Sequence, residues 1–494
     1  MTAAVHDRTT RSVRTASIAN LGCKVNQAEM EAAARLLRER GVAIVDRGAP
    51  ADLVLVNTCT VTAEADAKSR HVVRRARRTS PDAEIVVTGC SVQVGREAFA
   101  AADPAARLVD NRSKDALLAE IATLVDVGAD GSRPLPRALP TLSGVEIEGI
   151  ADGRASVERT RAFIKVQDGC SFFCTYCIIP AARGAERSLS PETVLHDVRR
   201  ALRAGHREIV LTGINIGTYD GGRSERGYRG SHRRSALTLA GLVRRILGET
   251  EVERIRLSSI EPQHVDDDLL DAWTDGAPRT LPHVHLPLQS GDDGVLRRMG
   301  RRYVSAEYAA IVRRVRDAIP GAAIHADAIV GFPTEDDPAF ERSIAFIRSL
   351  DLAGLHVFRY SARQGTAAVR MRGQVDEPTK KRRAAALLAL AAEARATWAA
   401  THVGREADVL FETRLDDGRW AGHAADHTLV ATATSAWLDQ AAPASAASAP
   451  SASMENHIGR VRIEAVDPAV RDRVVGRLVS VSPPRVPGVP HRAI

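Results

Sequence analysis

Six cysteines are the residues of this 494-residue chain with the clearest chemical potential, and they form two groups of three. One group is local and lies in the sequence CSFFCTYC, whose C-x3-C-x2-C spacing comprises Cys170, Cys174 and Cys177. The other group is dispersed and comprises Cys23, Cys59 and Cys90. Six cysteines are too sparse for a disulfide scaffold, and the N-terminus lacks the apolar core of a secretion signal. Thiolate chemistry or metal binding in a reducing, cytoplasmic setting is therefore favoured.

Each dispersed cysteine lies two or three residues after the end of a run that is typical of a strand. These runs are Ser17–Leu21, DLVLV at 52–56 and EIVV at 84–87, and helical segments rich in Ala, Glu and Arg separate them. Such a β-α-β-α-β order predicts a parallel sheet, in which the carboxyl ends of the strands share one edge. We therefore expect the three thiols to lie on the same rim. Three separately buried core cysteines are the alternative.

Three thiolates leave a metal centre incomplete. A tetrahedral zinc ion requires a fourth ligand, and no histidine lies within four residues of any cysteine, so zinc is disfavoured unless a distant histidine completes the site. On a 4Fe–4S cluster, three cysteines leave one iron free to bind a substrate or an added sulfur.

The middle of the chain, residues 158–395, predicts a partial (β/α)6 barrel. Its six strand-like segments are FIKVQDGC, EIVLTGINIG, RIRLSSIEP, HVHLPLQSG, AAIHADAIVGFP and GLHVFRY, with amphipathic stretches between several of them. In barrels of this type, chemistry occurs on the loops after the strands, and CSFFCTYC occupies the first such loop. Glycine or polar side chains mark the later strand ends and are candidate binding residues, with helix caps or turns as the alternative. They are Gly213, Asn215, Glu261, Gln289 and Asp327.

The flanking regions complete the predicted organisation. Residues 16–125 form the N-terminal α/β domain and 126–157 a linker rich in Gly, Pro and Ala, whereas the short strands of 400–482 predict a small all-β barrel. A low-complexity insert is expected at 436–455, and disordered tails at 1–15 and 483–494. No apolar run approaches the length of about 20 residues that spans a membrane. The net charge of +7 weakly favours a polyanionic partner.

Three motifs give this chain a resemblance to a known family. KVQDGCSFFCTYCIIPAARGAERS resembles the cluster loop of radical S-adenosylmethionine (SAM) enzymes, and LGCKVNQAE, VNTCTVT and TGCSVQ resemble the methylthiotransferase branch of that superfamily. LGCKVN is similar to the type that acts on threonylcarbamoyladenosine in tRNA. In the C-terminal region, HVGREADVLFE and HIGRVRIEAV resemble the TRAM domain, an OB-like RNA-binding barrel.

The resemblance implies two 4Fe–4S clusters and two SAM molecules per turnover. The local cysteines would hold the cluster that binds and cleaves SAM, and the dispersed cysteines an auxiliary cluster that carries the inserted sulfur. An external one-electron donor would start the reaction, which places a methylthio group at C2 of the modified adenosine at tRNA position 37. The polar rim from Gly213 to Asp327 would face SAM or substrate, and Phe172, Phe173 and Tyr176 would shield the first cluster. The family implies a monomer.

Several alternatives stay open at this point. A related enzyme could act on isopentenyladenosine in tRNA or on an aspartate of a ribosomal protein. Two further hypotheses assign the chain to a different functional class. It could be a non-catalytic iron–sulfur protein that binds RNA or carries electrons, or it could be a structural zinc protein. Arg183 and Arg187 could meet phosphate or the SAM carboxylate, or lie solvated on the surface. Trp420 could stack on RNA or belong to the core.

Overall fold

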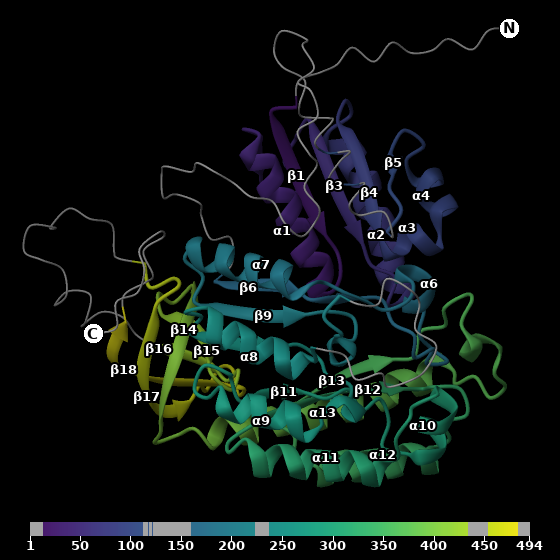
Figure 1. The fold of residues 1–494 in the computed structure, drawn as a ribbon. Coiled ribbons are helices and arrows are strands. Elements are labelled where there is room, and N and C mark those ends of the chain that lie inside the picture. Colours follow the sequence, from purple (N-terminus) through teal and green to yellow (C-terminus); the bar gives the residue numbers. More distant parts are fainter. Residues whose placement is uncertain are drawn as a thin grey trace, which may run out of the picture.

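The structure is a computed structural model that describes residues 13–111, 117, 121, 160–222, 237–432 and 453–482 (Figure 1). The predicted linker at 126–157 and the C-terminal tail at 483–494 lie outside these residues. Thr15, which the sequence prediction assigned to the N-terminal tail, is the first residue of a strand. Among the described residues, no helix is long and apolar enough to cross a membrane.

The N-terminal domain contains a parallel sheet with the strand order β2-β1-β3-β4-β5. Helix α1 packs on one face of the sheet, and α2 and α4 pack on the other (Figure 1). The order of the strands confirms the predicted parallel sheet. The strands are β1 (Thr15–Asn20), β2 (Ala43–Val45), β3 (Leu53–Thr58), β4 (Glu84–Gly89) and β5 (Arg107–Leu108). The helices are α1 (Lys24–Glu39), α2 (Ala63–Thr79), α3 (Cys90–Val94) and α4 (Arg96–Ala102).

The central domain confirms the predicted partial barrel. Its parallel strands run in chain order as two ladders, β6-β9-β10 and β11-β12-β13, and the Leu281 N–H joins them by donating to the Ile255 carbonyl at 2.9 Å. The strands are β6 (Arg161–Lys165), β9 (Glu208–Thr212), β10 (Arg254–Leu257), β11 (His283–His285), β12 (Ala323–Val330) and β13 (Gly354–Arg359). The short elements near the cluster loop are β7 (Gln167–Asp168), α6 (Ile179–Arg183) and β8 (Arg187–Ser188).

Helices cover the outside of this barrel, and several begin where the sequence supplies a capping side chain. Ser190, Asp336 and Asp376 each accept a hydrogen bond from a backbone N–H of the first turn, and a proline lies within that turn. The sequence prediction omitted α9 and α10, which are short. The helices are α7 (Pro191–Arg203), α8 (Leu239–Glu249), α9 (Asp267–Asp275), α10 (Asp293–Met299), α11 (Ser305–Ala318), α12 (Asp337–Ser349) and α13 (Glu377–Ala400).

The C-terminal region forms a small closed barrel with the strand order β14-β15-β16-β18-β17. Trp420 is 9% exposed and packs in its core, so Trp420 is a core residue and not an exposed stacking platform. Met454 is buried in the same core, although the sequence prediction placed it in the low-complexity insert. The strands are β14 (Glu406–Arg414), β15 (Trp420–Ala424), β16 (Leu429–Thr432), β17 (Ile458–Val466) and β18 (Arg473–Ser482).

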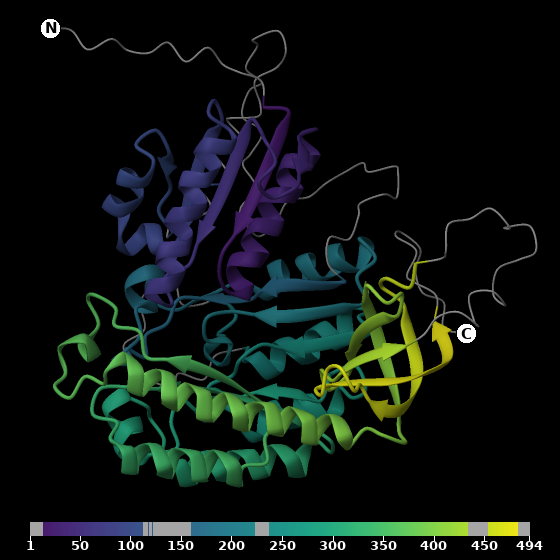
Figure 2. The ribbon, with the colours of Figure 1, turned by 180° about the vertical axis from the view of Figure 1, so that it is seen from behind.

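This barrel docks at the amino ends of the central strands, away from the cluster loop (Figure 2). Arg254 and Arg256 of β10 donate to backbone carbonyls of the C-terminal barrel, at 3.2 Å to Asp408 and 3.1 Å to Ala425. Both guanidiniums also pair with Glu208 of β9 at 2.8 Å. Burial opposes ionisation of Glu208, but the two arginines lower the pKa of its carboxyl to about 2.

Candidate active site

The parallel register brings the three dispersed cysteines to one edge of the N-terminal sheet. Asn20 of β1 pairs with Asn57 of β3, which pairs with Thr88 of β4, and each strand reaches its cysteine two or three residues later. The chains approach closely there, because a Cβ added at Gly22 would lie 3.1 Å from the Cβ of Cys59. The strand ends therefore gather Cys23, Cys59 and Cys90, as the sequence pattern predicted.

Two buried amides hold this dispersed triad in place. The Asn26 Nδ2 donates to the carbonyls of Leu21 and Thr58, each at 3.1 Å, and its Oδ1 lies 3.8 Å from the Sγ of Cys23. The Asn111 Nδ2 lies 3.7 Å from the Sγ of Cys90. Asn26 belongs to the LGCKVN motif, so part of that motif shapes the cysteine edge.

The local triad lies on a loop that hydrogen bonds fix at both ends. The Cys170 N–H donates to the Gly184 carbonyl at 3.1 Å, and the Cys177 N–H donates to the Cys174 carbonyl at 2.9 Å. The loop is also tied to α10, because the Thr175 N–H donates to the Met299 carbonyl at 2.9 Å. Three thiols are thus presented at the mouth of the partial barrel.

The aromatic residues of this loop differ in their surroundings. Tyr176 packs edge-on against Phe332, and the Arg302 guanidinium lies 4.7 Å from the centre of the Phe172 ring. Phe173 is 70% exposed, so it does not pack over the thiols as a shield. Two of the three aromatics therefore contact neighbouring elements, and the third projects into solvent.

The donor set and its spacing fit iron–sulfur clusters. Burial raises the pKa of the Cys59 and Cys170 thiols to about 11 and that of Cys177 to about 12, so iron must displace protons on binding. In the described part of the chain, one group of potential metal ligands has its donor atoms within 4.8 Å of one another, and this group contains no cysteine. The three Sγ atoms of each cysteine triad are therefore spread more widely than this. A single zinc ion binds thiolates at about 2.3 Å and so needs a tighter group. The wider spacing favours a cluster.

Sequence reasoning missed Arg301, which lies between the local triad and the polar rim. Its side chain is 3% exposed, and its Nη1 lies 3.6 Å from the Sγ of Cys174 and 3.2 Å from the Glu261 carboxylate. Its Nε donates to the Tyr303 hydroxyl at 3.0 Å. Arginine in RRY after a short helix carries no spacing signal, so only the tertiary contact reveals this role.

Two of the predicted rim residues lie where a bound group would fit. The Asn215 side chain is buried, and neither its Oδ1 nor its Nδ2 has a hydrogen-bond partner within the described structure. Buried amides are normally hydrogen-bonded, so Asn215 fits a ligand that supplies both a donor and an acceptor. A Cβ at Gly213 would lie 2.9 Å from the Gln167 carbonyl, so only glycine fits there without displacement. Two other predicted rim residues, Gln289 and Asp327, lie next to each other, because the Gln289 N–H donates to the Asp327 carbonyl at 2.7 Å.

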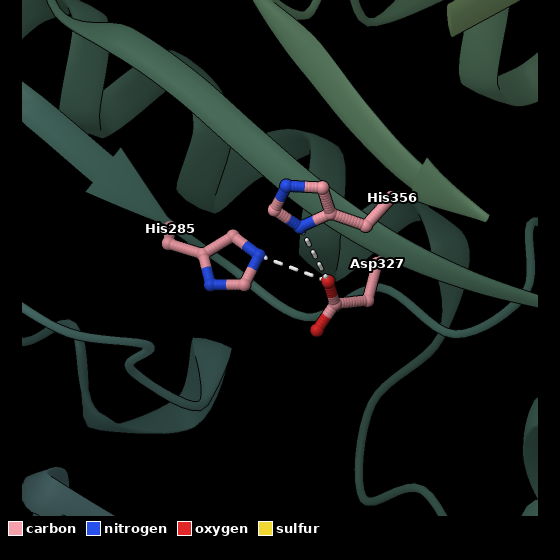
Figure 3. A group of neighbouring side chains, drawn as sticks. All are labelled: His285, Asp327 and His356. Carbon is pink, nitrogen blue, oxygen red and sulfur yellow. Dashed lines mark hydrogen bonds and ion pairs between the residues drawn. The ribbon is translucent and has the colours of Figure 1, made fainter. Parts of the chain in front are cut away.

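Asp327 is held by two histidines that sequence reasoning did not single out (Figure 3). Its Oδ1 lies 3.0 Å from the Nε2 of His285 and 3.1 Å from the Nδ1 of His356, and the Ser259 hydroxyl lies 2.5 Å from the other nitrogen of His285. Burial opposes ionisation, yet the two hydrogen bonds keep the pKa of the Asp327 carboxyl well below its usual range. The donor atoms lie within 4.8 Å of one another, close enough for one metal ion, although the hydrogen bonds already satisfy them.

Arg183 links the two triads through a buried ion-pair network. Its side chain is 1% exposed and pairs with Glu29 of α1 at 3.2 Å and with Asp168 at 2.8 Å. Burial opposes ionisation, but Lys165 and Arg183 hold the pKa of the Asp168 carboxyl well below its usual range. Arg183 therefore forms ion pairs with two carboxylates of the same chain. The expectation of a solvated or phosphate-binding residue is wrong. Arg187 pairs with the same Asp168 but is 47% exposed.

A partial parallel barrel with three loop cysteines, joined to a second cysteine triad on a parallel sheet, defines a radical SAM enzyme with an auxiliary site. Comparison with known proteins agrees: residues 164–347 match the radical SAM superfamily, and residues 15–110 match a family described as uncharacterized protein family UPF0004.

Curated relatives place the chain more narrowly, and the chain belongs to the methylthiotransferase family of radical SAM enzymes. It is 37% identical to the threonylcarbamoyladenosine tRNA methylthiotransferase MtaB of Bacillus subtilis, over 81% of this chain and 85% of that protein. The protein of the same name from Chlamydia pneumoniae is 38% identical, over 72% of this chain and 76% of that protein. A tRNA-2-methylthio-N(6)-dimethylallyladenosine synthase of Erythrobacter litoralis is 31% identical, over 84% of this chain and 90% of that protein.

Proposed function

We propose that this protein inserts a methylthio group at C2 of threonylcarbamoyladenosine, next to the anticodon at position 37 of tRNA. The observation that carries the proposal is the joining of two cysteine triads, one at the strand ends of the sheet and one at the barrel mouth. Arg183 joins them, because its guanidinium donates to the Asn26 side chain and pairs with Glu29 and Asp168. The substrate assignment is supported by the names of relatives at 37% and 38% identity and by the LGCKVN motif.

The proposed ligands divide into two sets. Cys170, Cys174 and Cys177 would hold the 4Fe–4S cluster that binds SAM, and Cys23, Cys59 and Cys90 the auxiliary 4Fe–4S cluster. When bound and reduced by an external one-electron donor, the first cluster and SAM supply hydrogen-atom abstraction from an unactivated carbon.

This chain's own residues position the groups. Arg301 orients Glu261 beside Cys174, and Asn215 offers an amide to SAM, together with the backbone at Gly213. Gln289 and Asp327 complete the rim facing SAM or substrate. The ion pairs of Arg183 fix the distance across which the substrate must fit. No acid–base pair is required, because the decisive step removes a hydrogen atom.

The remaining parts of the proposal concern the setting. The C-terminal barrel is assigned as a TRAM-like RNA-binding module, since its closed five-stranded architecture is the one its motifs resemble. We assign the protein to the cytoplasm, where its tRNA substrate and electron donor are found. We also propose that it acts as a monomer.

The test is an anaerobic assay with the reconstituted protein, SAM, dithionite and tRNA that carries threonylcarbamoyladenosine. Nucleoside mass spectrometry should detect the 2-methylthio product, and 5′-deoxyadenosine should form. A parallel reaction with isopentenyladenosine tRNA addresses the second candidate, which the relative from Erythrobacter litoralis favours. Product only from the second tRNA would overturn the substrate assignment, and 5′-deoxyadenosine formation absent from every reaction would overturn the enzyme class.

A further inference from the structure

Helix α2 of the N-terminal domain presents a continuous basic face. From Lys68 to the end of the helix, every exposed residue is basic, and we call this set the α2 stripe. The opposite face carries Ser69 and Val73, which are fully buried against the sheet. The stripe consists of Lys68, His71, Arg74, Arg75 and Arg78.

The side chains of the α2 stripe form no hydrogen bond or ion pair with any residue that the structure describes. Some exposed arginines elsewhere are balanced by carboxylates: Arg244 pairs with Asp268 at 2.6 Å, and Arg460 of the C-terminal barrel pairs with Asp408 at 3.0 Å. Arg77 of α2 itself pairs with Asp103, on a different side of the helix. The stripe differs from scattered surface arginines because five exposed basic residues follow one helix face with no exposed carboxylate among them.

The stripe begins beside the proposed auxiliary site. The Cys59 N–H donates to the Ser69 Oγ at 3.4 Å, and the Asp66 carboxylate accepts from the Ser91 hydroxyl at 2.5 Å. From Lys68 to Arg78 the helix rises about 15 Å, which is long enough to meet several successive phosphates. The stripe thus leads from the cysteine edge outward along the N-terminal domain.

We propose that the α2 stripe binds the phosphodiester backbone of the anticodon arm of tRNA while the target adenosine lies in the active site. This inference rests on the proposed function and names a surface that recognises the substrate. Unpaired cations in a row suit successive phosphates, since each contact releases counterions without breaking an ion pair within the protein. The C-terminal barrel lies on the opposite side of the molecule from α2 (Figures 1 and 2), so the stripe is a separate contact surface.

The test is the salt dependence of tRNA binding by the full-length reconstituted protein. The variant Lys68→Gln, Arg75→Gln, Arg78→Gln removes three cations and introduces no repulsion. Each lost phosphate contact should reduce the slope of log affinity against log salt by about 0.7–0.9, so the slope should fall by about 2–3. The ratio of Kd at 200 mM salt to Kd at 50 mM salt should therefore fall about 20- to 40-fold. SAM cleavage without tRNA, and kcat at saturating tRNA, should equal those of the wild type.

A matched variant removes the same charge from helices of the central domain. Arg313, Arg348 and Lys381 are exposed on or at the ends of α11, α12 and α13, and their replacement by Gln should leave the slope at the wild-type value. Equal slopes for the stripe variant and this control would overturn the inference. The product assay of the wild type is interpreted separately. If tRNA binding depends strongly on salt and on the stripe but no methylthio product forms, the proposed function is wrong and the RNA-binding surface is still supported.

Discussion

Replacing Arg183 with methionine should loosen the contact between the N-terminal domain and the cluster loop. The side chain is 1% exposed and pairs with Glu29 at 3.2 Å and Asp168 at 2.8 Å. Removing one partner from a buried ion pair leaves the other charges uncompensated, at a cost of about 3–5 kcal/mol. Arg187 is the matched control, because it contacts the same Asp168 at 3.2 Å but is 47% exposed. Arg187→Met should therefore cost at most about 1 kcal/mol.

Hydrogen exchange on the reconstituted protein measures this loosening directly, because local opening sets the exchange rate of each segment. We expect faster exchange in α1 and α6 for Arg183→Met and wild-type exchange for Arg187→Met. SAM cleavage, measured as 5′-deoxyadenosine, should continue in both variants. Methylthio product should fall in the Arg183 variant, because the two triads are no longer held at a fixed separation. Equal exchange rates in the two variants, or a parallel loss of cleavage and product, would refute this reasoning.

Three further predictions address the ligands, the rim and the pH dependence. Cys174→Ala should abolish 5′-deoxyadenosine formation, whereas Cys59→Ala should retain it and lose the methylthio product; product from the Cys59 variant would show that the two triads do not divide the reaction. Asn215→Leu fills the space of the unpartnered amide, and should raise the KM for SAM at least tenfold while the iron content stays at the wild-type value, with an unchanged KM arguing against a SAM contact. Glu208 has a pKa lowered to about 2, so its stabilising effect is present above its unfolded value of 4.5 and is lost as the pH falls towards 2. Denaturant unfolding at pH 5 and pH 2 should show a smaller loss of stability for Glu208→Gln than for the wild type, and equal losses would contradict the assignment.

The sequence alone determined the features that depend on local order along the chain. Strand-like runs ending in cysteine predicted the parallel sheet and the shared edge, because parallel strands align their carboxyl ends whatever the details of packing. The long helix α13 (Glu377–Ala400) likewise depends on local order, since its cap, Asp376, and its alanine-rich composition are features of neighbouring residues. The motifs also indicated the family that the comparisons confirm.

Tertiary structure alone decided the pairing of charged and polar groups across elements. Arg183 meets Glu29 from a position 154 residues away, and Arg301 reaches Cys174 across 127 residues, so no spacing in the sequence marks either contact. The burial of Trp420 was equally undecided, because an aromatic side chain alternating in a strand suits a core or an RNA surface alike. Periodicity specifies which face of an element is buried, but the partner opposite that face depends on how the folded domains pack, and the chemistry of this site depends on those partners.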